Sequence, residues 1–173
     1  MNKMVFTLVL TALLSVGSAL EVSAQQKIGH INSNELIMAM PERDTATNEL
    51  EAKRQEFIKQ SEELQVEFNK KYEVFTATGN TLTELIRQTK QAELQDMSRN
   101  IETFNAAADQ ELTRIQQELF QPVIEKAQNA IKEVAKEQGF TYILDISTGA
   151  VVYFPEEGTE NIMAAVKKKL GLE

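Results

Sequence analysis

The chain of 173 residues contains no cysteine, no tryptophan and a single histidine, His30. Without cysteine there is no disulfide framework, no thiol nucleophile and no thiol that could carry a lipid anchor. A lone histidine in a predicted strand is far more often a packed or surface residue than a catalyst or a metal ligand. The sequence therefore lacks much of the side-chain chemistry on which enzymes and metalloproteins depend.

Glycine is also scarce, and the seven glycines stand singly, so no glycine-rich loop is available to hold a phosphate. No serine lies in the context of a nucleophile elbow. Asp145 and the glutamate-rich segments could suggest paired carboxylates, but on helical arms such charges are usually solvated and paired along the helix. We therefore expect a protein that is not an enzyme and that binds no cofactor or metal.

Excess positive charge is absent as well, since the formal net charge is −8. An acidic balance argues against binding nucleic acid or anionic lipid through net charge. The run Lys167-Lys168-Lys169 lies near the end of a predicted terminal helix, where positive charge complements the helix dipole.

The first 24 residues have the pattern of a secretory signal peptide. Lys3 precedes an apolar run from Met4 to Leu14, and small residues precede Gln25. A membrane anchor is the alternative, but the apolar run is short and interrupted by polar residues. We expect export to the periplasm and cleavage after Ala24.

Residues 42–138 are predicted to form a long helical hairpin with its turn near Gly79 and Asn80. Apolar residues recur there in steps of three and four, with Glu, Gln, Lys, Asn and Arg between them. The apolar stripe is narrow, which is typical of a coiled-coil seam. Thr81 to Glu84 fits a capping box, which would start the second helix directly after the turn.

The two halves of this segment mirror each other about the turn. Facing residues of an antiparallel hairpin have residue numbers with a nearly constant sum, and several apolar pairs share the sum 161. The predicted seam consists of Leu50, Phe57, Leu64, Phe75, Ile86, Met97 and Phe104.

The remaining residues, 25–41 and 139–173, are predicted to form a small β-rich body. Three short strands are expected at Lys27–Asn32, Phe140–Ile146 and Val151–Phe154, the last two as a hairpin. Two short helices are expected at Glu35–Met40, capped by Asn32 or Ser33, and after a Thr159 cap. Pro41 suits the first turn of the arm, Pro122 predicts a kink, and Gly139 suits a helix C-terminus.

The fold class is thus α+β, with a long antiparallel coiled-coil hairpin projecting from a small body. A core of roughly seventy residues is marginal alone, and short apolar strands leave edges that need covering. We therefore expect a homo-oligomer. The candidate oligomerisation residues are Ile28, Ile31, Ile143, Ile146, Val151 and Tyr153.

This layout resembles the Skp/OmpH family of periplasmic chaperones. The resemblance covers essentially the whole mature chain, and its most specific part is the closing unit GFTYILDISTGAVVYF before the terminal helix. It implies a homotrimer whose helical tentacles enclose a cavity. In that cavity unfolded outer-membrane β-barrel proteins would be held without ATP and kept from aggregating in transit to the outer membrane.

Apolar arm residues off the predicted seam are the candidate client contacts: Ile58, Val66, Tyr72, Val74 and Leu82. Well-known family members are basic, whereas this chain is acidic, so contact with membrane lipid is in doubt. The rival hypothesis is an exported coiled-coil spacer or assembly protein with one dedicated envelope partner. Suppression of the aggregation of several unrelated barrels would distinguish a chaperone from a spacer.

Overall fold

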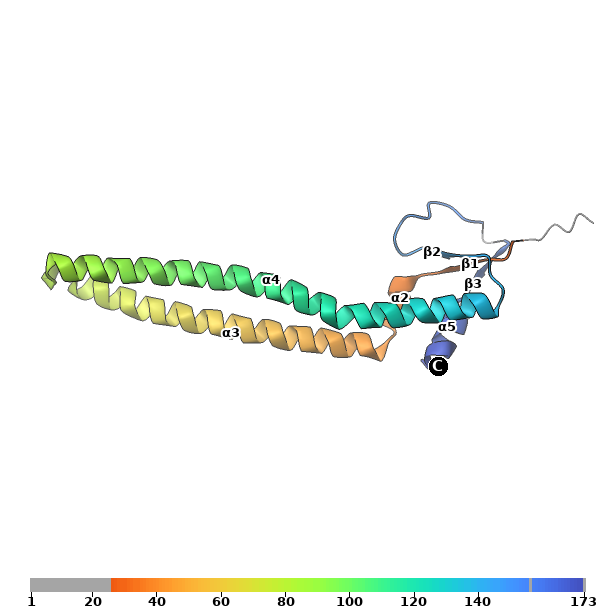
Figure 1. Cartoon of the computed structure of the whole chain (residues 1–173), viewed down its shortest axis with the longest axis horizontal. Coiled ribbons are helices and arrows are strands. Elements are labelled where there is room, and N and C mark those ends of the chain that lie inside the picture. The colour runs from red at the N-terminus through yellow and green to blue at the C-terminus, as the bar shows by residue number, and fades with distance from the viewer. Residues whose placement is uncertain (1–25, 156, 173) are drawn as a thin grey trace, which may run out of the picture.

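The computed structural model describes residues 26–155 and 157–172, so the predicted signal peptide lies outside the described residues. The molecule consists of a long helical arm and a small body built from both ends of the described chain (Figure 1). The elements in chain order are β1 (Ile28–Ile31), α2 (Ser33–Met38), α3 (Pro41–Thr78), η1 (Gly79–Thr81), α4 (Glu84–Glu137), β2 (Tyr142–Asp145), β3 (Thr159–Asn161) and α5 (Met163–Leu170).

The arm is the antiparallel pair of α3 and the first part of α4 (Figure 1). Helix α3 has 38 residues, so at 1.5 Å per residue the arm is about 57 Å long. Pro41 occupies the first turn of α3, where its missing N–H costs no hydrogen bond. Gly139, with φ +71°, ends α4, and the N–H of Phe140 donates to the Ala135 carbonyl at 2.9 Å.

The turn at the tip differs from the predicted capping box. Thr81 belongs to the 3₁₀ turn η1, where its hydroxyl donates to the Thr78 carbonyl at 2.7 Å. Helix α4 therefore begins two residues later than a Thr81 cap would place it, at Glu84, after Thr83, whose side chain makes no capping hydrogen bond. The prediction of a capping box was wrong because Thr81 is used to close the turn.

The predicted seam residues Leu50, Phe57, Leu64, Phe75, Met97 and Phe104 are all half-buried in the structure. Further interhelical contacts join Ser61 with Asn105 at 2.7 Å and Lys71 with Glu93 at 2.5 Å. Ile86 departs from the prediction, because 46% of it is exposed. The apolar packing near the tip is instead supplied by Leu94, which is buried.

The body is a three-stranded sheet in the order β2-β1-β3, and both pairings are parallel. Helices α4 and α5 lie on one side of the sheet and the loop after β2 on the other (Figure 1). The buried core contains Ile31, Leu36, Met40, Val123, Ala127, Ala130, Val134, Ile162 and Val166. The last part of α4 thus belongs to the body, where it packs against the sheet.

Two predictions about the body were wrong. Val151–Phe154 is not a strand, and the third strand is Thr159–Asn161, so no β2–β3 hairpin exists and both strands flank β1. Parallel pairing needs a long connection rather than a tight turn, and the loop from 146 to 158 provides it. The predicted Thr159 cap was also wrong, because Thr159 lies in β3 and the first N–H of α5 donates instead to the Asn161 side chain at 2.9 Å.

The arm joins the body where the two long helices part. Pro122 lies inside α4, which changes direction between its arm part and its body part (Figure 1). An internal proline removes one backbone hydrogen bond and crowds the preceding turn, so a bend there is expected. Glu42, at the start of α3, forms an ion pair with Lys126 of α4. In the described part of the chain, no helix is long and apolar enough to cross a membrane.

Candidate functional site

Among the described residues, no group of His, Asp or Glu side chains is arranged to hold a metal ion. Asp145, the one carboxylate singled out in the body, holds neighbouring segments together. Its carboxylate accepts hydrogen bonds from the Ser33 hydroxyl at 2.6 Å and from the backbone N–H groups of Ser33 and Ser147 at 3.2 and 2.9 Å. Asp145 thus ties the start of α2 to the end of β2.

The ionisation of Asp145 follows from these contacts. Partial burial raises the pKa of the carboxyl, but the hydrogen bonds from Ser33 and Ser147 outweigh it, and the pKa of Asp145 lies below its ordinary value. At neutral pH the carboxylate is therefore ionised, and it accepts the hydrogen bonds from Ser33 and Ser147. This arrangement is that of a structural clamp.

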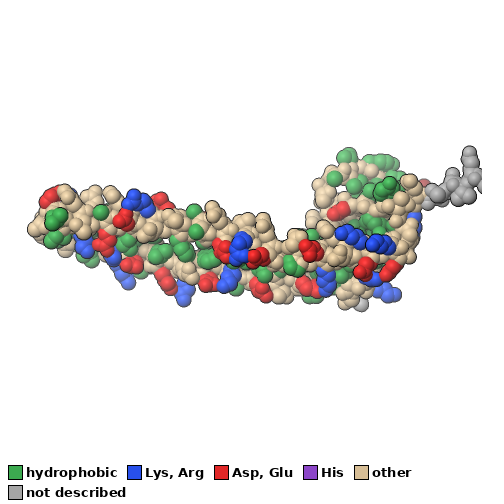
Figure 2. Space-filling model, in the orientation of Figure 1, with side chains coloured by type: hydrophobic (Ala, Val, Ile, Leu, Met, Phe, Trp, Pro, Cys, Tyr) green, Lys and Arg blue, Asp and Glu red, His purple; other side chains and the backbone are tan. Residues whose placement is uncertain are grey.

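The arm carries a series of exposed apolar side chains, separated by charged ones (Figure 2). Ile58, Val66, Tyr72 and Val74 are all exposed, with Val74 the most at 64%. Leu82, the remaining predicted client contact, is half-buried at the tip. Isolated apolar side chains on a polar surface offer many small contacts and no single deep one.

Two hollows lie along the arm beside these residues. At the tip, a cavity of about 360 Å³ has a largely apolar lining, which includes Val74, Phe75, Leu82 and Leu94. Midway along the arm, a groove of about 320 Å³ is lined by Phe57 and Ile58 together with polar side chains. The exposed candidates at both places thus border concave surface.

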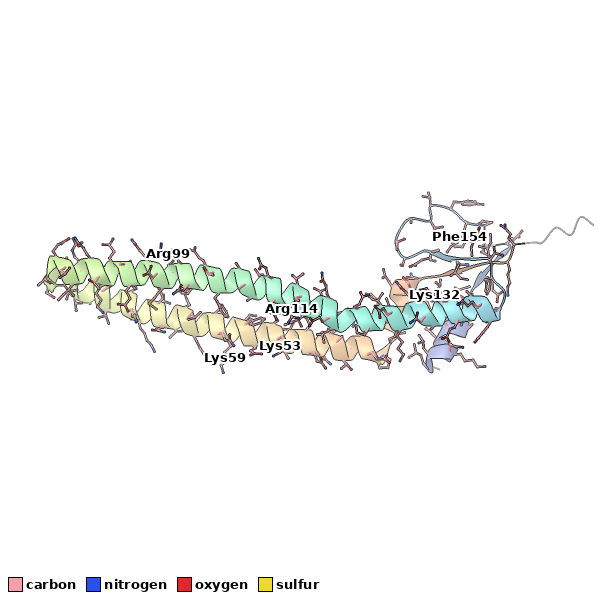
Figure 3. All side chains as sticks on the ribbon, viewed as in Figure 1. Lys53, Lys59, Arg99, Arg114, Lys132 and Phe154 are labelled. Carbon is pink, nitrogen blue, oxygen red and sulfur yellow. The ribbon has the colours of Figure 1, made fainter. Side chains whose placement is uncertain are left out.

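Charged side chains on the arm are mostly paired along their own helix. Arg114 contacts both Glu111 and Glu118 on α4, and Arg87 pairs with Glu84 at 2.7 Å. Figure 3 shows Lys59 projecting from α3 away from α4. Exposed ion pairs of this kind add little stability, and their main effect is to keep the arm well hydrated between its apolar side chains.

The face of the sheet opposite the helices carries a second apolar surface, most of it in the loop after β2. Val152 is 94% exposed and Tyr153 is 83% exposed, and hydrophobic side chains gather over this loop in Figure 2. Phe154 turns back onto the sheet, where its ring lies 4.8 Å from that of His30 (Figure 3). This surface, comprising Tyr142, Val151, Val152 and Tyr153, is called the outer apolar patch below.

The predicted oligomerisation residues divide between the two sides of the sheet. Ile31 is 1% exposed and belongs to the core of the single chain, on the side of the sheet that faces the helices. Ile143 also packs against the core, because it lies opposite Gly29 in the parallel pairing of β1 and β2, on the core side of the sheet. Ile28, Ile146 and Val151 are half-buried, and Tyr153 lies in the outer apolar patch. Val152 and Tyr142 were not among the predicted residues, although both are exposed and both belong to the apolar runs that mark the closing unit.

Residues 27–170 match the family described as "Outer membrane protein (OmpH-like)". The chain belongs to the OmpH/Skp family of chaperones. The match spans both parts of the body and the whole arm, so the outer apolar patch and the hollows of the arm are parts of an OmpH-like fold. The family is one of chaperones and not of enzymes.

Individual OmpH-like relatives are distant in sequence but similar over most of their length. The Chaperone protein Skp of Pectobacterium atrosepticum is 24% identical over 157 residues, covering 89% of this chain and 93% of the relative. Skp of Yersinia enterocolitica is 25% identical over 159 residues, covering 88% and 95%. A crystal structure of a putative outer membrane chaperone (OmpH-like) from Caulobacter crescentus has a TM-score of 0.71 at 15% identity, covering 90% of this chain and 86% of that one.

Proposed function

We propose that this protein is an ATP-independent holdase chaperone of the periplasm. It binds unfolded outer-membrane β-barrel proteins between its helical arms and prevents their aggregation on the way to the outer membrane. The observation that carries the proposal is the arm itself, a helical hairpin about 57 Å long with separate exposed apolar side chains on a hydrated, ion-paired surface. Membership of the OmpH/Skp family supports it.

Such a surface suits a client that has no fixed structure. An unfolded barrel strand presents apolar side chains at alternate positions, and each can contact an isolated residue such as Ile58 or Val66. Single contacts of this kind are weak, but many contacts on one tethered chain add up through effective concentration. Release then needs no nucleotide, because contacts break one at a time.

Several arms working together require an oligomer, and we propose a homotrimer assembled through the outer apolar patch. Val152 and Tyr153 expose more apolar surface than a small body usually leaves in water. Segment 151–154 has the composition of a strand without strand partners in the single chain, so pairing with another copy would satisfy its backbone groups. Side-by-side bodies would place three arms around a common cavity.

Export is the remaining part of the proposal. The signal-peptide pattern of residues 1–24 predicts delivery to the periplasm with cleavage after Ala24. Mass spectrometry of the protein recovered from the periplasm of an expression host measures this directly. A mature N-terminus at Gln25 is expected, and retention of residues 1–24 in the membrane fraction would contradict cleavage.

The function is tested by sedimentation velocity on the mature protein, alone and mixed with a urea-unfolded outer-membrane β-barrel diluted into buffer. We expect an elongated oligomer that keeps the barrel soluble as a discrete complex, and the same result with a second, unrelated barrel. Precipitated barrel beside an intact oligomer would contradict holdase activity and would favour a spacer with one dedicated partner.

A further inference from the structure

The tip cavity of the arm combines an apolar floor with a cationic rim. Its floor is formed by Val74, Phe75, Leu82 and Leu94, and Lys70, Lys71, Lys90 and Glu93 also line it. Three lysines against one glutamate is an unusual balance in a chain whose net charge is −8. The cavity lies between the two helices of one hairpin and does not need a second copy of the chain.

The lysines of the rim are not equivalent. Glu93 is shared, with its carboxylate 2.5 Å from the Lys71 ammonium and 3.4 Å from that of Lys90. Lys71 also pairs with Glu67 at 3.4 Å. Within ranges 26–155 and 157–172, no ion pair involves Lys70. The positive charge left over at the rim therefore centres on Lys70.

We propose that this cavity is a binding site for an extended peptide segment in which a large apolar side chain lies two positions from an acidic residue. The apolar side chain enters the cavity, and the carboxylate two positions away reaches Lys70. Residues of an extended chain advance about 3.3 Å each, so a carboxylate two positions away lies on the same side, about 7 Å along the arm. The proposal rests on the holdase function and names a sequence preference within it.

Charge complementarity favours a peptide over a membrane surface as the occupant. Phe75, Leu82 and Leu94 of the floor are half-buried or buried, whereas insertion into a lipid headgroup layer needs apolar side chains on a protruding face. A net charge of −8 also opposes approach of the whole molecule to an anionic bilayer. A single acidic side chain on a flexible segment meets the local charge of the rim without that opposition.

The test measures binding of dye-labelled 12-residue peptides to the whole mature protein by fluorescence anisotropy. The first probe carries one Phe with an Asp two positions before it and another two positions after it, in a Gly/Ser background. A second probe has Lys in place of Asp, and a third has Ala in place of Phe. The first probe is expected to bind most tightly, and equal affinity for all three would overturn the proposal.

Two substitutions locate the site. Thr78→Trp fills the cavity from the end of α3 and is expected to weaken binding of the first probe by about tenfold or more, since burial of a large apolar side chain contributes roughly 1.5–3 kcal/mol. Lys70→Gln is expected to weaken the Asp-containing probe by about twofold to fivefold and to leave the Lys-containing probe unchanged. Unchanged binding of the first probe by both variants would overturn the proposal.

Lys59→Gln is the matched control, because it removes the same charge from α3 at a position that does not line the cavity and points away from α4 (Figure 3). Binding of the first probe to this variant is expected to match the parent. Circular dichroism reports whether Thr78→Trp keeps its helix. If that variant unfolds, Leu82→Ser removes one apolar wall and serves the same purpose, with the same expected loss of binding.

Two further experiments distinguish this inference from its alternatives. Dodecanoate below its micellar concentration tests a fatty anionic ligand, and tighter binding of it than of the first probe, lost in Thr78→Trp, would overturn the peptide assignment. The barrel-aggregation assay is run on the same variants. A parent that suppresses aggregation but binds no probe overturns only the inference, whereas a parent that binds the probe but suppresses no aggregation overturns only the holdase function.

Discussion

Phe57 of α3 and Phe104 of α4 meet edge to face across the arm, with ring centroids 6.4 Å apart and ring planes at 77°. Both residues are half-buried, and the contact lies midway along the hairpin, beside the polar bridge between Ser61 and Asn105. An edge-to-face pair is directional, so together with this bridge it defines how α3 and α4 are aligned.

Phe104→Ala is expected to destabilise the middle of the arm. Complete removal of a buried Phe costs about 3–5 kcal/mol, so for this half-buried ring we expect about 1–3 kcal/mol. Amide hydrogen exchange measures the effect as faster exchange in the arm, while the body amides remain protected. Ile58→Ala, next to Phe57 but exposed, is the control, and an equal effect of the two variants would contradict the role of the pair.

The protein is expected to be destabilised by a larger residue in place of Gly29. An added Cβ would lie 2.7 Å from Cδ1 of Ile143 and 3.0 Å from Cε1 of Phe140. Gly29→Ala should therefore lower the free energy of unfolding by about 1–3 kcal/mol in urea denaturation, since overpacking forces core side chains aside. Gly79→Ala is the matched control, because open space surrounds it and its φ of −54° is helical. That variant should be neutral or slightly stabilised, and equal losses for both glycines would contradict the packing argument.

Asp145→Asn tests the clamp on α2. The pKa of Asp145 is lowered in the folded protein, so its contribution to stability is complete above the unfolded-state pKa of about 3.9 and is lost as the pH falls through the lower folded value. At neutral pH the variant should be about 1–2 kcal/mol less stable. Urea denaturation of both proteins across this pH range should show the difference shrinking in acid. A constant difference would show that ionisation of Asp145 contributes nothing.

Tyr153→Asp tests assembly through the outer apolar patch. A charge placed in a buried apolar interface without a partner is costly, so sedimentation velocity is expected to show smaller species than for the parent. Val66→Asp introduces the same charge at an exposed site on the arm and should leave the oligomer intact. An unchanged oligomer in the Tyr153 variant would exclude the patch as the interface.

Local pattern determined most of the arm. The signals for the arm are all short-range. They are apolar residues in steps of three and four, a glycine at the tip, Pro41 in the first turn of α3 and Gly139 just after the last turn of α4. Because α3 and α4 follow each other along the chain through a tight turn, their pairing needs little information beyond helical spacing. The conformation of the tip was not predicted correctly, because Thr81 could serve either as a helix cap or as part of a 3₁₀ turn.

The strand pairing of the body was determined by tertiary structure. Segment 151–154 has the composition of a strand, yet β1 has only two edges, and these are taken by β2 and by the polar segment Thr159–Asn161. Strand pairing is a competition between distant segments, and composition alone does not reveal which segment wins. The same competition decided which apolar side chains face water: Ile31 went into the core, whereas Val152 and Tyr153 were left on the outer surface. The sequence by itself determined that an arm exists and where it turns, and only the packing of the body decided which apolar surface remains exposed.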